Sequence, residues 1–414
     1  MTLLYLGDKI SPYFQQPLIE KISERGKIMK KTTKVVAVVL SLALGLMAFA
    51  GCGAKKGYTA NNTEFVIGVS GPLTGPAAVY GTAVQNSAQM AVDEINAAGG
   101  LNGVKFKLVA TDDTHDATKV ATNYASMLES GMQVSLGTVT TAPALEFKKL
   151  SVEDNVFFLT PSASGDKVPE FDNGFQMCFA DGNQGKVAAE YVNSTDLTKI
   201  GIFYKSDDPY SKGIFDQFKE NLDDSIETVE TVFTDANATD FSTQISTLKD
   251  CSFVFMPIYY QPAAIFMTQA KDTIKKDAVY YGCDGFDGLA GQLDLTTIPQ
   301  EVTMLSHFDS NATEGAAAEF IKKYTEKYGA DTLNQFGASA YDCIYAIYNA
   351  MKAAIDAGTE IDVTISASDL CDILKAQFTG DFSYSGVTGS DITWEDNGFV
   401  SKAAVKYVMK EADK

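Results

Sequence analysis

Short runs rich in β-branched and aromatic residues alternate along this chain with segments whose apolar residues recur at helical spacing. The first expected series is strand 64–70, helix 78–98, strand 105–111, helix 116–130, strand 134–137, helix 142–153 and strand 156–160. The second is helix 182–193, strand 199–204, helix 211–222, strand 227–233, helix 241–248, strand 252–256, helix 262–275 and strand 278–282. A repeated strand–helix order is typical of a parallel sheet with helices on both faces. The pattern therefore predicts an α/β protein with two doubly wound, Rossmann-like lobes.

The pattern changes after Ser306, where helical spacing dominates. We expect helices at 313–328, 335–357 and 367–378. The tail, residues 390–408, predicts a β-hairpin with Asp396-Asn397-Gly398 at its turn, because Asn-Gly pairs favour tight hairpin turns.

A targeting segment is indicated near the start of the chain. Met29 is followed by lysines, an apolar run at 35–49 and the small residues Ala50 and Gly51 before Cys52. This order is typical of a secretory signal peptide, and the run is shorter than the roughly 20 residues of a membrane-spanning helix. The segment 49–52 resembles a bacterial lipobox, which implies cleavage before Cys52 and a lipid attached to it. The alternatives are an uncleaved anchor or a buried cysteine.

We accordingly expect an extracytoplasmic protein, lipid-anchored to the bacterial cell membrane, with a signal peptide at 29–51 and a polar tether at 52–63. Residues 1–28 precede the methionine at which such a signal begins. Within them, residues 24–27 would be encoded by purine-rich codons, as a translated ribosome-binding site would be. Our hypothesis is that synthesis starts at Met29 and that 1–28 is an untranslated or mis-assigned extension.

The charge balance excludes one class of partner. The chain has 53 acidic and 33 basic residues, a net charge of −20, and Arg25 is its single arginine. Nucleic-acid recognition depends on basic patches and arginine forks, so no nucleic-acid partner is expected. Bidentate arginine clamps on phosphates or carboxylates are likewise excluded outside Arg25. The cysteines after Cys52 are widely spaced, without a CxxC pair, and are expected to be small core residues; they are Cys178, Cys251, Cys283, Cys343 and Cys371.

The segments that follow the expected strands are the candidate binding loops, because ligands of open α/β sheets bind beyond the carboxyl ends of the strands. These loops are 71–75, 138–141, 161–164, 206–210, 258–260 and 283–285. They are rich in hydroxyls and aromatic rings and contain few charges. Such a set favours a small polar ligand with an apolar part.

An ordered series of motifs resembles the periplasmic substrate-binding proteins of ABC importers, in particular the branched-chain amino-acid (leucine/isoleucine/valine) group. The resemblance covers 64–410, and its motifs are Ile67-Gly68-Val69, Gly71-Pro72-Leu73-Thr74-Gly75, Tyr80-Gly81, the segment 89–103, Phe382 and Gly386-Val387-Thr388-Gly389. The family fold it implies is the type I periplasmic binding protein fold, two lobes joined by a three-segment hinge. It assigns 64–180 and 307–385 to lobe 1, and 181–306 and 386–414 to lobe 2. The implied crossings lie near 180–181, 305–306 and 386–389.

The resemblance also implies a ligand site. The family's carboxylate-binding hydroxyl falls on Thr141, and its loop after the fourth strand falls on Ser162, Ala163 and Ser164. There the Ser162 carbonyl and Ser164 hydroxyl take the ligand's ammonium, and the Ser164 N–H takes its carboxylate. The acid that faces the ammonium falls on Asp284, one methylene shorter than the glutamate frequent in the family. The implied aromatic contacts are Tyr80 and Phe336 from lobe 1, and Tyr210 and Tyr259 from lobe 2.

Structural interpretations of several residues stay open beside these roles. Thr141 and Ser164 are alternatively helix N-caps, Asp284 a cap or surface carboxylate, and Tyr210 and Tyr259 ordinary core aromatics. The acidic segment 112–116 is compatible with a metal site, but we expect a solvated loop in which Asp116 caps the next helix. His307 has no serine or cysteine at the spacing of a catalytic motif. We expect no metal, no cofactor and no catalysis.

The resemblance thus predicts a receptor that binds a small amino acid, branched-chain or aliphatic, between two closing lobes. It would deliver this ligand to an ABC permease driven by a separate ATPase, and we expect it to act as a monomer. The alternatives are a receptor of the same fold for an amide, urea or aromatic acid, a sensor ectodomain that signals to a membrane partner, and a secreted enzyme.

Overall fold

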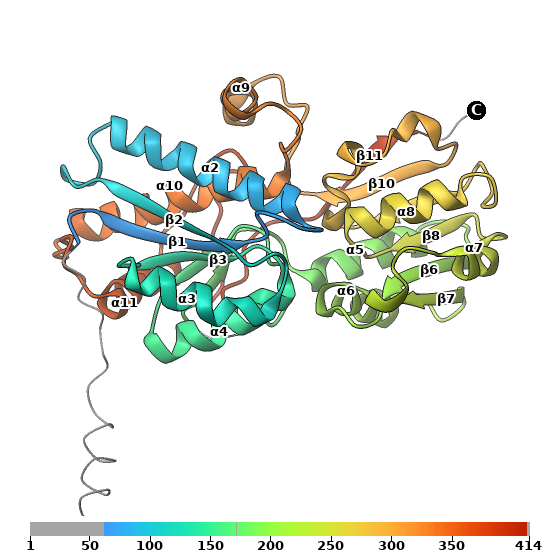
Figure 1. Ribbon diagram of the computed structural model, residues 1–414, viewed down its shortest axis with the longest axis horizontal. Coiled ribbons are helices and arrows are strands. Elements are labelled where there is room, and N and C mark those ends of the chain that lie inside the picture. The colour runs from blue at the N-terminus through green and yellow to red at the C-terminus, as the bar shows by residue number, and fades with distance from the viewer. Residues whose placement is uncertain (1–61, 171, 412–414) are drawn as a thin grey trace, which may run out of the picture. The chain divides into compact units, whose positions relative to one another are not determined.

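Five parallel strands form the first sheet, in the order β2–β1–β3–β4–β5 (Figure 1). Their bounds are β1 Phe65–Gly71, β2 Phe106–Asp112, β3 Val134–Thr138, β4 Phe158–Thr160 and β5 Gly174–Gln176. Strand β1 is buried along its whole length, because helices cover both faces of a parallel sheet. The structure is a computed structural model that describes residues 62–170 and 172–411. The expected signal peptide, Cys52 and the expected extension 1–28 lie outside the described residues.

The second sheet has the order β11–β10–β9–β8–β6–β7. Its strands are β6 Lys199–Lys205, β7 Glu227–Phe233, β8 Phe253–Met256, β9 Val279–Gly282, β10 Glu301–Ser306 and β11 Val405–Lys410. Strands β6 to β10 are parallel and repeat the order of the first sheet, whereas β11 pairs with β10 in the antiparallel sense. In both sheets the strand order therefore reverses beside the first strand of the series, which is where doubly wound proteins bind ligands.

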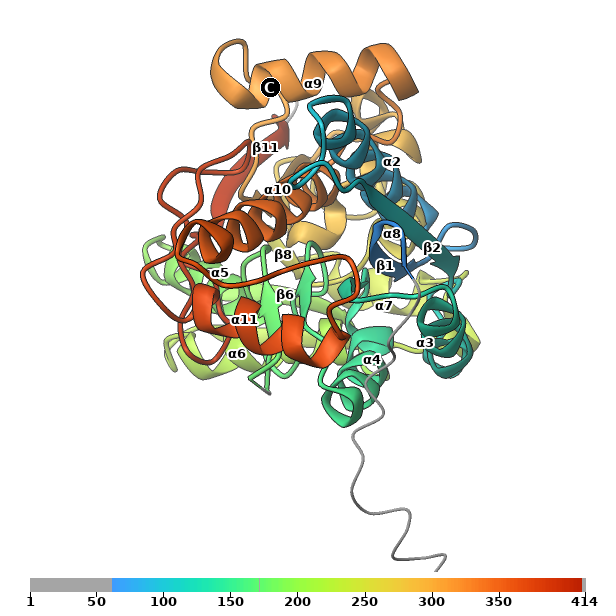
Figure 2. The same ribbon diagram turned by 90° about the vertical axis from the view of Figure 1, so that its left-hand side faces the viewer.

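Helices cover both faces of the first sheet (Figures 1 and 2). The helices α2 Ala78–Ala97, α10 Gln335–Asp356 and α11 Ala367–Phe378 share one hydrophobic core. The helices α3 Val120–Glu129 and α4 Thr141–Asp154 share a second core on the other face. Helix α9, Gly315–Tyr328, lies outside α2, and its Lys323 and Lys327 form ion pairs with Glu94 and Asp93 of that helix.

The second sheet is covered in the same way. Helices α5 Asp181–Asn193 and α6 Pro209–Asn221 pack on one face, and α7 Ser242–Leu248 and α8 Tyr260–Ala270 on the other. The short 3-10 helices are η2 Ala117–Lys119, η3 Asp235–Asn237, η4 Asp284–Phe286, η5 Leu289–Gly291 and η6 Leu295–Thr297. The predicted α/β class with two doubly wound lobes is confirmed, and the cysteines after Cys52 are buried.

Two strands are missing from the sequence prediction, and one hairpin is wrong. Strand β5 was not expected because it has only the residues Gly174–Gln176, and β10 lies in a stretch to which no element was assigned. The tail is not a long hairpin. Trp394 and Val400 form an isolated antiparallel bridge around the expected turn, while β11 pairs with β10 instead of the preceding segment.

The tail also corrects the expected boundary of lobe 2. We expected residues 386–414 to belong to that lobe, but the segment around Trp394 packs on the first. Trp394 Nε1 donates a 2.7 Å hydrogen bond to the Gln176 carbonyl of β5, and its ring lies 4.4 Å from that of Phe378 in α11. The Gln176 N–H donates to the Gly398 carbonyl at 3.0 Å. The third crossing therefore lies between Val400 and β11, not at 386–389.

The remaining crossings run from β5 to α5 and from β10 toward α9. Across residues 62–170 and 172–411, none of the helices combines the length and the apolar character that crossing a bilayer requires.

Candidate functional site

A small cavity lies where strand-ending loops of the two sheets meet. Its lining comes from both lobes and consists of Tyr80, Val139, Thr140, Thr141, Ser162, Ser164, Tyr210, Tyr259, Asp284, Gly285 and Phe336. All the expected site residues except Ala163 are among them. The enclosed space is about 10 Å³, roughly what a single water molecule requires. Anything larger fits only when the lobes separate or these side chains move.

Aromatic rings form the wall of the cavity. Tyr80 of α2 meets Phe336, in the first turn of α10, edge to face with centroids 4.9 Å apart. From the second lobe, Tyr210 and Tyr259 stack at 4.5 Å with their planes 13° apart. The centroids of Tyr80 and Tyr259 lie 6.0 Å apart, so the two pairs touch across the cleft. The result is an apolar, shaped wall with hydroxyl groups at its edges.

Local sequence fixes the position of Tyr210. Asp208 caps α6, accepting from the Ser211 N–H at 3.0 Å, and Pro209 follows at the first helical position. This pairing is a strong helix-start signal. It places Tyr210 in the first turn of α6, where its hydroxyl donates to Asp284 Oδ1 at 2.7 Å and accepts from the Gly285 N–H at 2.9 Å.

Asp284 lies in η4, directly after β9, and its side chain is buried. Its own N–H donates to Gln184 Oε1 at 2.9 Å. The next residue must be glycine, since an added Cβ at Gly285 would lie 2.6 Å from the Tyr210 hydroxyl. The Gly285 carbonyl accepts from the Tyr80 hydroxyl at 2.6 Å. This single turn thus joins the acid to both lobes.

Burial raises the pKa of the Asp284 carboxyl to about 6, although hydrogen bonds from Tyr210, Gln184 and the Gly285 N–H favour its charged form. The interpretation of Asp284 as a surface carboxylate is therefore wrong. A buried carboxylate without a cation is costly. It is a ready partner for a positively charged group that enters the cavity.

Sequence reasoning missed a second buried acid, Asp181, although it recognised this position as a crossing. Asp181 is the first residue of α5, and its Oδ1 accepts from Gln184 Nε2 at 3.3 Å. Its Oδ2 has no hydrogen-bond partner among the described residues. Burial, and then the charge of Asp284, hold the pKa of Asp181 well above its ordinary value. Gln184 therefore connects Asp181 to Asp284, while Asp181 itself does not line the cavity.

The N-terminus of α4 forms an electropositive part of the cavity wall. Thr140 occupies the N-cap position and Thr141 is the first helical residue. The first backbone bond of the helix runs from the Ala144 N–H to the Thr140 carbonyl, so the N–H groups of Thr141 and Ala142 precede it. Such N–H groups and the helix dipole favour an anion. The N-cap interpretation of Thr141 is wrong by one residue.

The loop after β4 lines the cavity with serines, but not with Ala163. The N–H groups of Ser162 and Ala163 both donate to Thr160 Oγ1, at 3.4 and 3.0 Å. The Ala163 carbonyl accepts from Gln176 Nε2, and its side chain packs into the core on the far face of the sheet. Ser164 lies in this loop and not at a helix start, so its N-cap interpretation is also wrong. Its carbonyl accepts from the Asp181 N–H at 2.8 Å.

The acidic segment 112–116 stabilises a loop. Asp112 Oδ1 accepts from the Leu73 N–H, and Asp116 caps η2 by accepting from the Thr118 N–H, both at 2.9 Å. The predicted capping role of Asp116 is confirmed. Asp113 differs from the expectation of a solvated loop because it is buried and accepts from the Ser70 hydroxyl at 3.0 Å. No cluster of metal-ligating side chains occurs in the part of the chain that the structure describes.

His115, on the same loop, contacts the site and was not predicted from the sequence. Its Nδ1 shares a 2.9 Å hydrogen bond with Thr140 Oγ1, and its ring meets that of Tyr259 edge to face at 5.3 Å. Burial, and then the charge of Lys205, lower the pKa of His115. No motif marks this histidine, because only the fold brings it to Thr140 and Tyr259.

His307 has a serine partner that its sequence spacing did not indicate. Its Nε2 and Ser339 Oγ, in α10, share a 2.7 Å hydrogen bond. Ser339 is fully buried, and His307 Nδ1 has no partner among the described residues. A nucleophilic triad needs an accessible nucleophile and a group that orients the histidine. The pair has neither, so it is not a catalytic dyad.

Fold and site together define a two-lobed receptor that encloses a small ligand at the switch points of two parallel sheets. The chain belongs to the periplasmic binding protein family, whose model matches residues 64–410. Members of this family are non-catalytic receptors.

Relatives support the same family. The chain is 28% identical over 354 residues to the Leu/Ile/Val-binding protein BraC3 of Rhizobium johnstonii, covering 83% of this chain and 90% of that protein. It is 26% identical over 346 residues to the leucine-, isoleucine-, valine-, threonine-, and alanine-binding protein of Pseudomonas aeruginosa, covering 80% and 88%. The branched-chain amino acid transporter substrate binding protein LivJ of Streptococcus pneumoniae, solved with isoleucine, superposes with a TM-score of 0.70 at 26% identity, covering 83% of this chain and 100% of that chain.

Proposed function

We propose that this protein binds a branched-chain or aliphatic amino acid between its lobes and delivers it to an ABC permease driven by a separate ATPase. The observation that carries this proposal is the polarity of the cavity. The buried acid Asp284 and the N-terminus of α4 both line it, together with aromatic rings. A zwitterion with an apolar side chain complements all three parts.

The ligand's ammonium group pairs with Asp284, supported by Asp181. Tyr210 holds the Asp284 carboxylate in place, and the ammonium supplies the cation that this buried acid otherwise lacks. Removing one partner of such a buried pair costs a few kcal/mol. A neutral amide, a urea or an aromatic acid leaves the acids uncompensated, so these alternative ligands are disfavoured.

The ligand's carboxylate binds at the start of α4, where the Thr141 hydroxyl, the Ser164 N–H and the helix N–H groups act as donors. The Ser162 carbonyl and the Ser164 hydroxyl complete the ammonium site. No arginine occurs after Arg25, so these neutral donors take the place of a guanidinium. Hydrogen bonds between neutral donors and a carboxylate are charge-assisted and short.

The ligand's side chain packs among Tyr80, Phe336 and Tyr259. Aromatic walls favour an aliphatic group of compact shape, and the names of the relatives above point to the same ligands. Asp284 is shorter than glutamate by one methylene, so we infer a small adjustment of ligand position within the amino-acid class. We also propose that Cys52 carries the lipid anchor and that the mature protein is an extracytoplasmic monomer.

A thermal-shift screen of the twenty amino acids, benzoate, acetamide and urea on the purified protein tests this proposal. We expect isoleucine, leucine or valine to raise Tm the most, and Asp284→Asn to reduce the shift strongly. Asp207→Asn, in the adjacent loop 206–210, serves as the control and should retain it. A shift with benzoate or an amide alone would favour the alternative ligands. A shift with none of these compounds would contradict a receptor for small solutes of this kind.

A further inference from the structure

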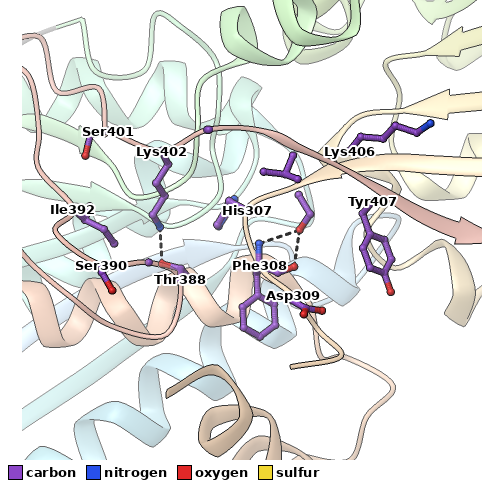
Figure 3. A pocket seen from close by; sticks show the side chains of 14 residues that line it. His307, Phe308, Asp309, Thr388, Ser390, Ile392, Ser401, Lys402, Lys406 and Tyr407 are labelled. Atoms are coloured by element: carbon purple, nitrogen blue, oxygen red, sulfur yellow. Dashed lines mark hydrogen bonds between the residues drawn. The ribbon is translucent and has the colours of Figure 1, made fainter. Parts of the chain in front are cut away.

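A second pocket lies at the hinge (Figure 3). We call it the hinge pocket. It is formed by residues of the segments 306–309, 388–392 and 401–407 and has a volume of about 570 Å³. Small-molecule sites have volumes of roughly 300–1,000 Å³. None of its lining residues lines the cavity that contains Asp284.

Lys402 carries the main charge of this pocket. Its Nζ donates to Thr388 Oγ1 at 2.6 Å (Figure 3). The Thr388 hydroxyl donates in turn to Asp342 Oδ2. Asp342 also accepts from the Tyr384 hydroxyl and from the N–H groups of Val387 and Thr388. The carboxylate is thus satisfied without direct contact to the ammonium. An ammonium has three donors, and among the described residues Thr388 is the one acceptor that Lys402 reaches.

His307 supplies a second donor that lacks an acceptor. Its Nε2 is occupied by Ser339, and its buried Nδ1 has no partner among the described residues. When Ser339 donates to Nε2, the proton of the neutral ring lies on Nδ1. Burial, and then the charge of Lys402, lower the pKa of His307, so the ring is neutral. A buried donor without an acceptor is costly, and an anion in the hinge pocket would satisfy it.

The rest of the lining is mixed. Phe308 and Ile392 are apolar and buried, and Ser390 is an exposed hydroxyl. Lys406 also lines the pocket, but it is engaged with Glu301 at 3.6 Å and with the Tyr191 ring at 4.3 Å. Asp309 is the one acid in the lining, and it is exposed. The unpaired groups therefore favour a ligand with one negative end and a short apolar part.

We propose that the hinge pocket binds a small organic carboxylate, whose carboxyl group accepts from Lys402 and His307 and whose apolar part lies against Phe308 and Ile392. Two of the three crossings line this pocket. The third contributes Phe179, whose ring meets that of His307 at 5.1 Å. A ligand bound here contacts segments whose geometry depends on the angle between the lobes. Its binding is thereby coupled to lobe closure, and the coupling is reciprocal.

Calorimetric titration with sodium butyrate tests the site. Butyramide, an uncharged compound of similar size and shape, serves as the control. We expect butyrate to bind the protein even when the main cleft is saturated with isoleucine, and butyramide not to bind. Lys402→Met weakens butyrate binding at least tenfold. Burial lowers the pKa of Lys402 to about 8, whereas Asp342 raises it. Butyrate affinity therefore falls as the pH rises through 8, because the ammonium loses its charge.

A second pair of variants keeps the test independent of the buried lysine. Val405 and Val408 are both exposed valines of β11, 61% and 37% exposed, but only Val405 lines the pocket. Val405→Glu places a negative charge beside the bound carboxylate and weakens butyrate binding at least tenfold. Val408→Glu leaves butyrate affinity unchanged. Equal butyrate affinity in the wild type, Lys402→Met and Val405→Glu, or no butyrate binding at all, would overturn the proposal. Binding of isoleucine is measured separately, so a negative result with butyrate would not contradict the proposed function.

Discussion

Asp284 is the residue on which the account of the site depends most. It is 2% exposed and hydrogen-bonded to Tyr210, and burial raises the pKa of its carboxyl to about 6 from an ordinary value of 3.8. Such a group lowers the stability of the folded state at neutral pH, because its charge has been removed from water and is not paired with a cation. Binding sites commonly retain a group that reduces stability for the sake of function.

Asp284→Asn is expected to stabilise the protein without ligand at pH 8. The folded state binds this proton more tightly than the unfolded chain does, so stability is lost as the pH rises from about 4 to 6. The difference between the folded and unfolded pKa values of Asp284 corresponds to a loss of about 3 kcal/mol of folding stability above pH 6. Urea denaturation at pH 8 and pH 4 checks this. A variant less stable than the wild type at pH 8 would contradict the account.

Affinity for isoleucine is expected to fall as the pH drops below about 6. Protonation of Asp284 removes the charge that pairs with the ammonium, which costs up to about tenfold in Kd for each pH unit. Calorimetry between pH 4.5 and 8 measures this dependence. The Asp284→Asn variant is the control, since it lacks the titrating carboxyl and should show a much flatter profile. A flat profile in the wild type would remove Asp284 from the ammonium site.

At this scale the sequence indicates which residues surround the cavity, because the ends of parallel strands meet at one edge of a sheet. Ala163 was placed there by its neighbours, but its carbonyl and side chain are used elsewhere. Asp181 and His115 were missed for a different reason. Their contacts with Gln184, Thr140 and Tyr259 depend on tertiary packing, which no local pattern reveals.

At the scale of elements, the tail is the segment that the sequence predicts least well. Its Asn-Gly turn is real, but the flanking residues pack on β5 and α11 and do not extend the hairpin. Longer helices were predicted almost to the residue, because apolar spacing alone defines them; α11 has the expected bounds. A short strand such as β5 has too few residues for any periodicity.

Trp394→Ala is expected to destabilise the protein by about 3–5 kcal/mol, because it leaves a cavity beside Phe378 and removes the hydrogen bond to Gln176. Trp394→Phe keeps most of the packing and should cost far less, about 1–2 kcal/mol. Urea denaturation followed by circular dichroism compares the two, since Trp394 is the only tryptophan of the chain. Equal stability of the alanine variant and the wild type would show that the tail is not part of the first lobe.

At the scale of the whole molecule, the two lobes meet around the cavity through aromatic rings and a few hydrogen bonds. The Tyr80 hydroxyl of the first lobe donates to the Gly285 carbonyl of the second, and the Gln335 N–H at the start of α10 donates to Asp287 at 2.9 Å. Because the enclosed space is close to that of one water molecule, ligand exchange requires opening. A ligand that touches both lobes shifts the population toward the closed form.

Tyr80→Phe is expected to favour the open form when no ligand is bound. The lost hydrogen bond is worth about 1 kcal/mol, or roughly a fivefold change in the open–closed ratio. Small-angle X-ray scattering should give a larger radius of gyration for this variant without ligand and the wild-type value at saturating isoleucine. Tyr348→Phe, on the far part of α10, serves as the control. Identical curves for Tyr80→Phe and the wild type would show that this contact does not hold the lobes together.

A crystal structure of the protein with L-isoleucine tests the central claim most directly. The account predicts one isoleucine between the lobes, with its ammonium group within hydrogen-bond distance of the Asp284 carboxylate. Its carboxylate should lie at the start of α4 beside Thr141 and Ser164, and its side chain among Tyr80, Phe336 and Tyr259. A ligand bound in the reverse orientation, with its ammonium away from Asp284, would contradict the account, as would isoleucine bound outside this cavity.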